Sequence, residues 1–490
     1  MLRSIKFIYE VTKRKMKDII VKCFQTLNNY YFYDRCSNSI VKVNHSEYEI
    51  LKKIEETGVI PQNVDVLNRF YEEGLLNKRI TCEVNNHLDY DMEYSMSNNI
   101  GELILQVTQQ CNLRCAYCAY SGNYYNREHS DKRMTFETAK QAIDFYLTHT
   151  NDTDQLTIAF YGGEPLLEFS LIEKCVEYTN KKAEDKNIRY FITTNGTLLT
   201  DKTIPFLVKH NFVVTISLDG NKEEHDINRK FRDGRGSFDL IISNLRRLKK
   251  YDEEFFSNVR YNTVINPKAN LKEVIDYFLN DDLIDPMNIH ISSLAQAGLK
   301  NPSLLETDEN FWLPDAYEKL KILLFLLNKI KSNAITPFYR GQIDEFVTFY
   351  KTLQNKTPEL EVMQHGGPCI PGARRLFVDT IGRMYPCERV NELSPDMNIG
   401  DVENGFNFEH AHAIYNIGKI TEKYCLDCWN LRLCRMCAGS IDSDPETNRI
   451  TPYNKLCKCE KSKMEILSKL RRICTLVEMG YKYQEESEDE

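Results

Sequence analysis

The chain has 490 residues, of which 42% are hydrophobic and 27% charged, so it holds enough apolar material for about three globular domains. Its formal net charge is −8 and it has no long basic run, which argues against nucleic acid as the main partner. No apolar stretch approaches the roughly 20 residues that cross a membrane, and the first residues contain no signal-peptide core. We therefore expect a cytoplasmic protein whose 16 cysteines serve metals or catalysis rather than disulfides.

The sequence of residues 1–98 predicts a small α+β domain. Two β-prone runs, 30–33 and 40–43, are separated by turn-forming residues, and this pattern predicts a hairpin. Ser46 is expected to cap the helix that follows, with Glu49 completing a capping box. A strand pair followed by helices is therefore expected before the main domain.

From residue 102 the pattern changes to apolar strands that alternate with amphipathic helices. Strands are expected at 103–107, 156–161, 189–193, 213–218, 260–264 and 287–291. Helices are expected at about 135–149, 168–183, 201–210, 236–250 and 270–280. This alternation predicts parallel strands with right-handed crossovers, and six units over 99–300 predict a partial barrel rather than an eight-stranded one.

Four other segments lack this alternation. An acidic, turn-rich stretch at 83–99 predicts a linker, and 301–365 predicts a helical region inserted after the barrel. Residues 366–475 are rich in cysteine and predict a loop-rich domain. The last segment, 476–490, ends with five acids in six residues and predicts a solvated tail.

Cys111, Cys115 and Cys118 form a C-x3-C-x2-C motif soon after the first expected barrel strand. Loops at the carboxyl ends of barrel strands are where barrel active sites lie. Three thiolates on one short loop suit an iron–sulfur cluster that keeps one iron open for catalysis, whereas a structural zinc site usually takes four ligands. A zinc loop or three unrelated buried thiols are the alternatives.

This motif resembles that of the radical SAM superfamily, and the resemblance covers about 102–295. In that family the three cysteines hold a [4Fe–4S] cluster whose remaining iron chelates S-adenosylmethionine. Electron transfer then releases a 5′-deoxyadenosyl radical that abstracts hydrogen. The resemblance implies that Tyr117 packs near the adenine of the cofactor, although a plain core tyrosine is the alternative.

Two further loops after strands agree with the resemblance, and a third leaves two alternatives open. Gly162, Gly163, Glu164 and Pro165 resemble the family's GGEP motif, whose backbone and acid bind the methionine amino group. In related maturases a serine and an arginine meet the carboxylate and ribose of the cofactor. Ser217, with Asp219 beside it, and Arg229 match that pattern by position, although an ordinary loop with a surface arginine is the alternative. Asn195 could line the same pocket or simply form a turn.

A second group of cysteines lies within residues 369–459: Cys369, Cys387, Cys425, Cys428, Cys434, Cys437, Cys457 and Cys459. Two zinc sites are one explanation, and iron–sulfur clusters need the same ligand type. The arrangement resembles the SPASM extension of radical SAM peptide maturases, although the spacing from Cys434 to Cys437 is one residue shorter than in that pattern.

The SPASM resemblance implies two auxiliary clusters, each expected to be [4Fe–4S]. The ligands of one would be Cys425, Cys428, Cys434 and either Cys457 or Cys459. The ligands of the other, nearer the barrel, would be Cys369, Cys387 and Cys437. No fourth ligand is evident for this second cluster, and an open iron there could bind a substrate thiolate directly.

The first domain resembles the PqqD-like peptide-recognition element of maturases that act on ribosomal peptides. An exposed strand edge in such a domain can take a leader peptide as an added strand. A small domain that only packs on the barrel is the alternative. The resemblance therefore implies a precursor peptide with a leader as partner, together with a flavodoxin- or ferredoxin-type reductant.

Residues 106–134 look most like maturases of cysteine-rich peptides. In those relatives a radical on a residue's carbon couples with a cysteine thiolate to give a thioether. We therefore expect an oxidative enzyme that forms thioether cross-links in a ribosomally synthesised peptide. Formylglycine formation on a sulfatase and carbon–carbon cross-linking are enzymatic alternatives, and a zinc-stapled binding scaffold is a non-enzymatic one.

Overall fold

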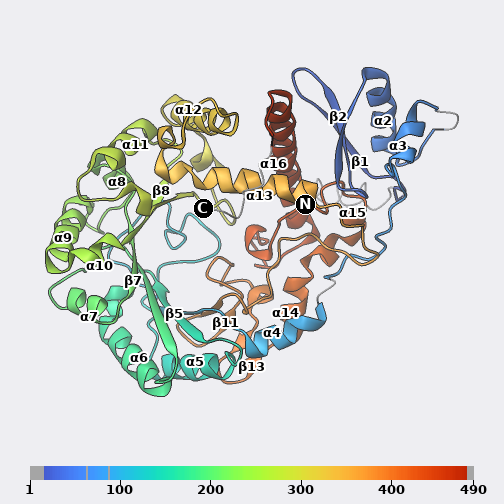
Figure 1. Cartoon of the computed structure of the whole chain (residues 1–490). Coiled ribbons are helices and arrows are strands. Elements are labelled where there is room, and N and C mark those ends of the chain that lie inside the picture. Colours follow the sequence, from blue (N-terminus) through green and yellow to red (C-terminus); the bar gives the residue numbers. More distant parts are fainter. Residues whose placement is uncertain (1–15, 62–64, 87–88, 483–490) are drawn as a thin grey trace.

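The computed structural model describes residues 16–61, 65–86 and 89–482. The parallel strands at its centre are β4 (Leu103–Thr108), β5 (Gln155–Gly162), β6 (Asn187–Thr194), β7 (Val213–Ser217), β8 (Arg260–Ile265) and β9 (Ile289–Ser293). The helices along the outer side of this curved sheet are α5 (Phe136–Thr148), α6 (Phe169–Lys182), α7 (Thr203–Lys209), α8 (Lys222–Asn228), α9 (Phe238–Tyr251), α10 (Glu253–Ser257) and α11 (Leu271–Asn280) (Figure 1). Strands β4 to β9 are neighbours in sequence order, which confirms the predicted parallel α/β sheet.

The sheet continues past β4 with two strands that the sequence did not predict. β10 (Leu376–Val378) pairs in parallel with β4, and β11 (Met384–Tyr385) pairs antiparallel with β10. Both come from the cysteine-rich segment, so the C-terminal region is built onto the barrel sheet. Strands of three and two residues are too short for a periodic pattern to be detected in the sequence.

The N-terminal domain contains a three-stranded antiparallel sheet in the order β1 (Val21–Gln25), β2 (Tyr30–Asp34) and β3 (Ser39–Val43). The expected hairpin is β2–β3, and β1 is an additional strand. Helix α2 (His45–Thr57) is capped by Asn44, whose side chain accepts from the backbone of Glu47, so the expected cap at Ser46 is wrong by two residues. The second helix is short, α3 (Asn68–Glu72), and follows a 3-10 turn.

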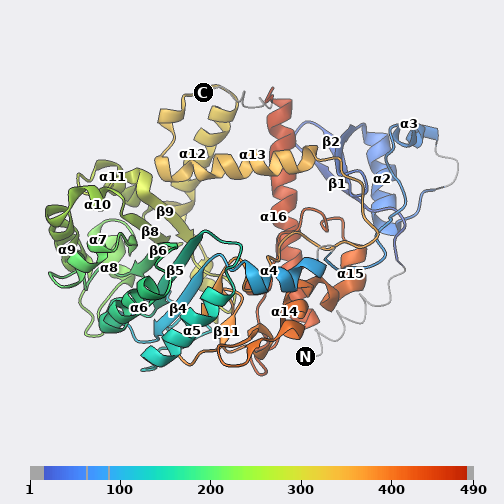
Figure 2. The same ribbon diagram turned by 60° about the horizontal axis from the view of Figure 1, so that its bottom comes forward.

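The stretch expected to be a linker contains a helix, α4 (Met92–Asn98). Met92 and Met96 are fully buried and belong to the main core of the barrel. Figures 1 and 2 both show α4 beside α14 (Phe408–Tyr415), and His412 of α14 pairs with Glu93 of α4. Two buried methionines in an otherwise polar run gave too weak a pattern to predict this packing.

Helices α12 (Glu309–Leu326) and α13 (Gly341–Gln354) follow the barrel, in the region that was expected to be helical. The cysteine-rich region is more helical than expected, because it contains α14, α15 (Glu422–Leu426) and the long α16 (Pro452–Glu478). Short strands β12 (Gly400–Asp401) and β13 (Gly405–Phe406) form a separate pair. None of the helices among the described residues is long and apolar enough to cross a membrane. Residues 483–490 of the expected acidic tail lie outside the described residues.

The N-terminal sheet packs on α13 and α16, as Figure 1 shows. Phe24, Tyr31 and Tyr33 share a core with Phe349 of α13 and Leu470 of α16. At the far end of α16, the carboxylate of Glu478 accepts hydrogen bonds of 2.7 Å from both Tyr31 Oη and Thr26 Oγ1. The first domain is therefore fixed to the last helix of the chain.

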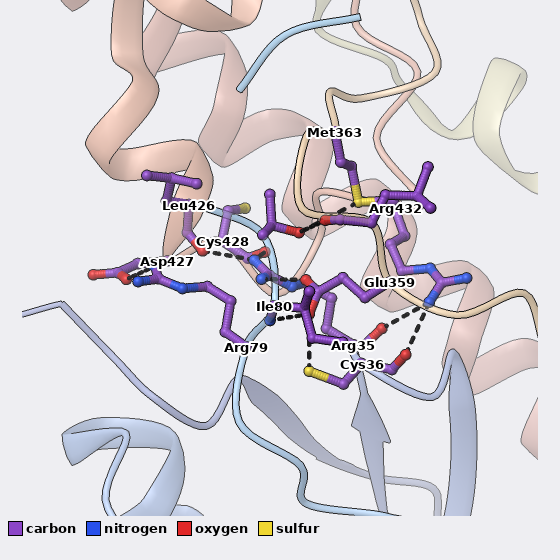
Figure 3. A network of polar contacts seen from close by, with 12 residues as sticks. Arg35, Cys36, Arg79, Ile80, Glu359, Met363, Leu426, Asp427, Cys428 and Arg432 are labelled. Atoms are coloured by element: carbon purple, nitrogen blue, oxygen red, sulfur yellow. Dashed lines mark hydrogen bonds and ion pairs between the residues drawn. The ribbon is translucent and has the colours of Figure 1, made fainter. Parts of the chain in front are cut away.

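A buried polar network joins the same domain to the cysteine-rich region (Figure 3). Arg35 forms an ion pair with Glu359, and neither side chain has exposed surface. The guanidinium of Arg35 also donates to the carbonyl oxygens of Leu426 and Cys428, at 2.6 and 3.2 Å. Arg432 donates back to the carbonyl oxygens of Arg35 and Cys36, at 3.3 and 3.0 Å. The loop that carries Cys428 is thus held directly by the N-terminal domain.

Candidate functional site

The three cysteines of the first motif lie on the loop that follows β4. Cys115 is buried, and Cys111 and Cys118 are half-buried. Burial is the largest cause that raises the pKa of each thiol, to about 12 for Cys111 and about 11 for Cys115. A metal centre would offset this cost, because binding to iron stabilises the thiolate form.

Gly162 and Gly163 let this loop pack closely against the end of β5. A Cβ atom on Gly162 would lie 2.0 Å from the carbonyl oxygen of Thr108, and one on Gly163 would lie 2.0 Å from that of Gln110. The N–H groups of Gly163 and Glu164 donate to these same two oxygens, at 2.9 and 2.8 Å. Glycine is therefore required here by contact with the cysteine loop itself.

Glu164 is buried and ties β5 to β6. Its Oε1 accepts from the hydroxyl of Thr194 at 2.7 Å and from the N–H of Leu166 at 3.1 Å, while Oε2 accepts from the N–H of Asn195 at 2.7 Å. Burial raises the pKa of Glu164, and these hydrogen bonds oppose that shift. Pro165 begins the 3-10 turn that follows. The carboxylate retains acceptor capacity on Oε2 for the predicted ammonium.

The Asn195 side chain lies against the cysteine loop rather than only within its own turn. Its Nδ2 donates to Asn112 Oδ1 at 2.8 Å and lies 3.9 Å from Cys111 Sγ. Its Oδ1 accepts from the hydroxyl of Thr197 at 2.6 Å, which fixes the orientation of the amide. Of the two alternatives for Asn195, this geometry favours a place in the pocket.

Tyr117, Asp219 and Arg229 form one buried cluster beside Cys115. Asp219 receives a bidentate contact from Arg229, with Nε–Oδ2 and Nη2–Oδ1 distances of 2.8 and 3.2 Å, and also accepts from the Tyr117 hydroxyl. The Arg229 guanidinium lies 5.4 Å from the Tyr117 ring centre, and its Nη1 lies 4.0 Å from Cys115 Sγ. Ser217 is buried at the end of β7, two residues before Asp219. The direct contact of Arg229 with the cofactor carboxylate stays a prediction, because two of its nitrogens already bind Asp219.

His225 supports this cluster and had no role in the sequence analysis. The N–H of Asp219 donates to its Nδ1 at 3.3 Å, and its Nε2 lies 3.0 Å from the Ser237 hydroxyl, which donates to the Arg229 carbonyl at 2.8 Å. Burial lowers the pKa of His225 to about 3, so the ring is neutral at physiological pH. The neutral imidazole therefore links the backbones of Asp219 and Arg229.

A second buried polar cluster joins the barrel to the cysteine-rich region. Arg127 pairs with Glu392 at 2.6 Å and donates to the carbonyl oxygen of Glu388. Gln106 of β4 donates to the Glu392 carboxylate at 3.0 Å and to Tyr120 Oη at 2.7 Å. The sequence pointed to Arg127 only through a resemblance and gave no signal for Glu392, which is far away in the chain.

Four cysteines line one small cavity in the C-terminal region: Cys425, Cys428, Cys434 and Cys459. Cys457 is exposed, whereas Cys459 is buried. Both lie on α16, where residues two positions apart point to different sides. The structure therefore brings Cys459 and not Cys457 to this group, which we call the outer cysteine site.

His365, Lys455, Tyr424 and Lys463 line the same cavity. Lys455 is fully buried and donates to Thr421 Oγ1 at 2.6 Å and to Cys425 Sγ at 3.4 Å. His365 is 3% exposed, and neither of its ring nitrogens has a hydrogen-bond partner among the described residues. Burial, followed by the charge of Lys455, lowers the pKa of His365 to about 4.

Cys369, Cys387 and Cys437 form a second group, which we call the inner cysteine site. Burial is the main cause that raises the pKa of Cys387 to about 11, followed by Glu388 and then by Cys369 and Cys437. The six remaining cysteines are Cys23, Cys36, Cys82, Cys175, Cys457 and Cys474. None of them is among the main influences on the pKa of Cys369 or Cys387, and Cys457 is exposed on α16. The described residues thus bring no fourth cysteine to the inner site.

The chemistry of the donors suits iron–sulfur clusters at all three sites. Each site offers at least three cysteine sulfurs, and cysteine is the usual protein ligand of such clusters. Within 16–61, 65–86 and 89–482, no group of three or more His, Cys, Asp or Glu side chains is close enough to hold a single metal ion. A cluster requires a wider arrangement, because each thiolate binds a different iron. The donor sets therefore fit the groups that the sequence predicted.

Comparison with known proteins adds independent support. The radical SAM superfamily model matches residues 105–279. The cysteine-type anaerobic sulfatase-maturating enzyme of Clostridium novyi is 32% identical over 386 residues, which cover 74% of this chain and 94% of that enzyme. The radical SAM cyclopropyl synthase TigE of Paramaledivibacter caminithermalis is 23% identical over 442 residues, covering 85% of this chain and 87% of TigE.

The fold is similar to a solved structure described as native anSMEcpe with bound AdoMet. The TM-score is 0.52 at 22% identity, and the match covers 76% of this chain and 99% of that one. A structure of the same protein with AdoMet and the Cp18Cys peptide gives the same TM-score, with coverage of 78% and 99%. At this identity the likeness supports the fold, and the function is argued from the site.

Proposed function

The chain belongs to the radical SAM superfamily, and on that premise we propose that it oxidises carbon centres in a ribosomally synthesised peptide, joining cysteine sulfur to carbon in a thioether. Its radical SAM domain makes it an enzyme that uses S-adenosylmethionine and a [4Fe–4S] cluster. The zinc-stapled scaffold without redox chemistry is therefore set aside. The peptide substrate, the thioether product and the two auxiliary clusters are the proposed part.

The inner cysteine site is the observation that carries this proposal. Its three cysteines would leave one iron without a protein thiolate, which suits capture of a substrate cysteine. Tyr161 has electrostatic neighbours at both sites. Burial is the largest influence on the raised pKa of Tyr161, and both Glu388, next to Cys387, and Cys118 of the radical site add to it. A peptide held at the inner site would therefore lie next to the source of the radical.

In this proposal Cys111, Cys115 and Cys118 would hold the cluster, which together with S-adenosylmethionine would supply the radical chemistry that removes hydrogen from the peptide. The chain's own residues bind and orient the cofactor. Glu164 would accept from the ammonium group of the bound cofactor, and Asn195 holds the cysteine loop in place through Asn112. Asp219 fixes the guanidinium of Arg229 and the ring of Tyr117, which flank the same pocket.

The N-terminal sheet is proposed to bind the leader of the substrate. β3 lies at one edge of the sheet, and Lys42 on that strand is exposed. Tyr30, Val43 and Arg69 line a hollow beside this edge. An extended leader could add to β3 through backbone hydrogen bonds and place a side chain in the hollow. A flavodoxin- or ferredoxin-type protein is the proposed reductant.

The test is mass spectrometry of a cysteine-containing precursor peptide after anaerobic incubation with the reconstituted full chain, S-adenosylmethionine and dithionite. Thioether formation removes two hydrogen atoms for each cross-link and consumes a free thiol. Cys115→Ala is expected to give neither product nor 5′-deoxyadenosine. A wild-type enzyme that forms 5′-deoxyadenosine without changing any leader-bearing cysteine peptide would refute the proposed substrate class.

Formylglycine formation is the second candidate, because the Clostridium novyi sulfatase-maturating enzyme is 32% identical over most of its length. A sulfatase-derived peptide offered in the same assay would then exchange its cysteine sulfur for a carbonyl oxygen. Carbon–carbon bond formation is a third outcome, and the likeness to TigE motivates it. It removes hydrogen but leaves the cysteine thiols free for alkylation, which separates it from a thioether.

A further inference from the structure

The outer cysteine site contains two buried polar side chains that the proposed reaction does not explain. Lys455 has no exposed surface and donates to Cys425 Sγ at 3.4 Å. His365 lines the same cavity with both ring nitrogens unpartnered among the described residues. Lys463 also lines the cavity, but its ammonium already donates to Tyr424 and to the carboxylate of Glu460, so its charge has a partner outside the cysteines.

Burial of these groups is costly unless something in the cavity compensates for it. No ion pair joins Lys455 to a carboxylate within the part of the chain that the structure describes, and its neutral partner is the hydroxyl of Thr421. An ammonium removed from water needs a counter-charge, and a buried imidazole N–H needs an acceptor. No Asp or Glu of the described residues lines the cavity, and its four cysteines become thiolates, and so counter-charges, only when they bind a metal centre.

A four-iron cluster held by four thiolates would satisfy both side chains, since it is anionic and its sulfurs accept hydrogen bonds. Reduction by one electron makes such a cluster more negative by one unit of charge. A nearby ammonium and an N–H donor stabilise the reduced form more than the oxidised form, because the Coulomb attraction grows with the charge. Net charge and hydrogen bonds to sulfur are known determinants of cluster potential.

We propose that Lys455 and His365 are positioning residues that donate to the outer cluster at Cys425, Cys428, Cys434 and Cys459, and that they raise its reduction potential so that it accepts electrons. This inference depends on the proposed function only in assuming that a cluster is bound there. Four protein ligands leave no iron open for a substrate, so electron transfer is the role that this site retains. The inner site, with three cysteines, keeps the substrate.

The test is a potentiometric EPR titration of the anaerobically purified full chain, with dithionite as the electron donor. The Cys115→Ala background removes the radical cluster and leaves the auxiliary signals. Lys455→Met is expected to lower the midpoint potential of one cluster signal by about 59 mV. For a one-electron couple this shift changes the reduced-to-oxidised ratio tenfold at a fixed potential. His365→Phe should shift the same signal in the same direction by a smaller amount.

Two controls separate charge from packing. Lys461→Met changes an exposed lysine on the same helix, outside the cavity, and should leave the midpoint unchanged. Lys455→Arg keeps the charge and should stay near the wild-type midpoint. Where Lys455→Met loses iron, the proposal is supported if Lys455→Arg keeps both its iron and the wild-type midpoint potential, because the two variants differ in the positive charge.

Two results would overturn the role of Lys455: an unchanged midpoint in Lys455→Met with full iron content, and equal loss of iron in the Met and Arg variants. A wild-type midpoint in His365→Phe would overturn the role of His365. Failure of the proposed function would appear separately, as wild-type protein that titrates as expected but leaves the precursor peptide unmodified.

Discussion

The buried pair of Arg35 and Glu359 fastens the N-terminal domain to the outer cysteine site, and its removal is the sharpest test of that connection. Both side chains are fully buried, and Arg35 also holds the carbonyl oxygens of Leu426 and Cys428. Loss of one partner from a buried pair leaves an uncompensated charge and costs about 3–5 kcal/mol. We expect Arg35→Met and Glu359→Gln each to weaken the interface by about this amount.

Trp429 is a local probe of this interface, because its ring lies 6.3 Å from that of Tyr33 in the N-terminal sheet. The chain has two tryptophans, so a Trp312→Phe background leaves Trp429 as the only fluorescent indole. Urea titration can then follow separation of the domain. With slopes of about 1–3 kcal/mol per molar, a loss of about 3–5 kcal/mol lowers the midpoint by about 1 M or more.

The double variant decides whether the two charges act on each other. Removing both charges is expected to recover part of the loss, since replacement of a whole buried pair is often close to neutral. Arg235→Met, which breaks an exposed pair with Asp233, is the matched control and should shift the midpoint little. A double variant that shows the full sum of both single losses, or singles that unfold like wild type, would refute the reasoning.

Three further predictions follow from individual residues. Gly163→Ala should abolish 5′-deoxyadenosine formation and radical-site iron, because its Cβ would meet a carbonyl oxygen at 2.0 Å, whereas Gly341→Ala, with nothing within 4 Å, should leave both intact. Cys459→Ala should lower the iron content by about four per chain and Cys457→Ala should not; equal losses would contradict the ligand assignment. Burial holds the pKa of His225 near 3, so below about pH 6.5 the unfolded state binds a proton that the folded state does not, and stability falls as the pH drops toward 3. His225→Gln should flatten this dependence in thermal unfolding between pH 7 and 4, and an unchanged slope would show that other groups cause it.

The barrel could be predicted from sequence because its signals are local. Most strands contain a short apolar stretch and are followed by a helix, and the observed bounds of the predicted elements differ from the expected ones by at most a few residues. The short helices α8 and α10 were not predicted. The cysteine loop and the Gly162–Pro165 segment were found in the same way, since their residues are consecutive. The actual reason for Gly163 was not visible, because the carbonyl that excludes a side chain belongs to another loop.

The parts that sequence analysis missed depend on distant partners. Arg35 and Glu359 are separated by 324 positions, and no local pattern pairs them. The choice between Cys457 and Cys459 needed the knowledge that both lie on a helix, whereas the region was expected to be loop-rich. Lys455 looked like any lysine in a charged stretch, and only burial against Cys425 distinguishes it.

The packing of the first sheet on the last helix has a consequence for how the protein is made. Phe24, Tyr31 and Tyr33 are covered in part by Ile466 and Leu470 of α16, which leave the ribosome after nearly all of the chain has been synthesised. Domains usually fold in order from the N-terminus during synthesis, but this one cannot bury its aromatic face completely until translation has passed α16, because α13 supplies only part of the cover. A nascent chain arrested before Pro452 therefore exposes that face, and chaperone binding at this stage would protect it from aggregation.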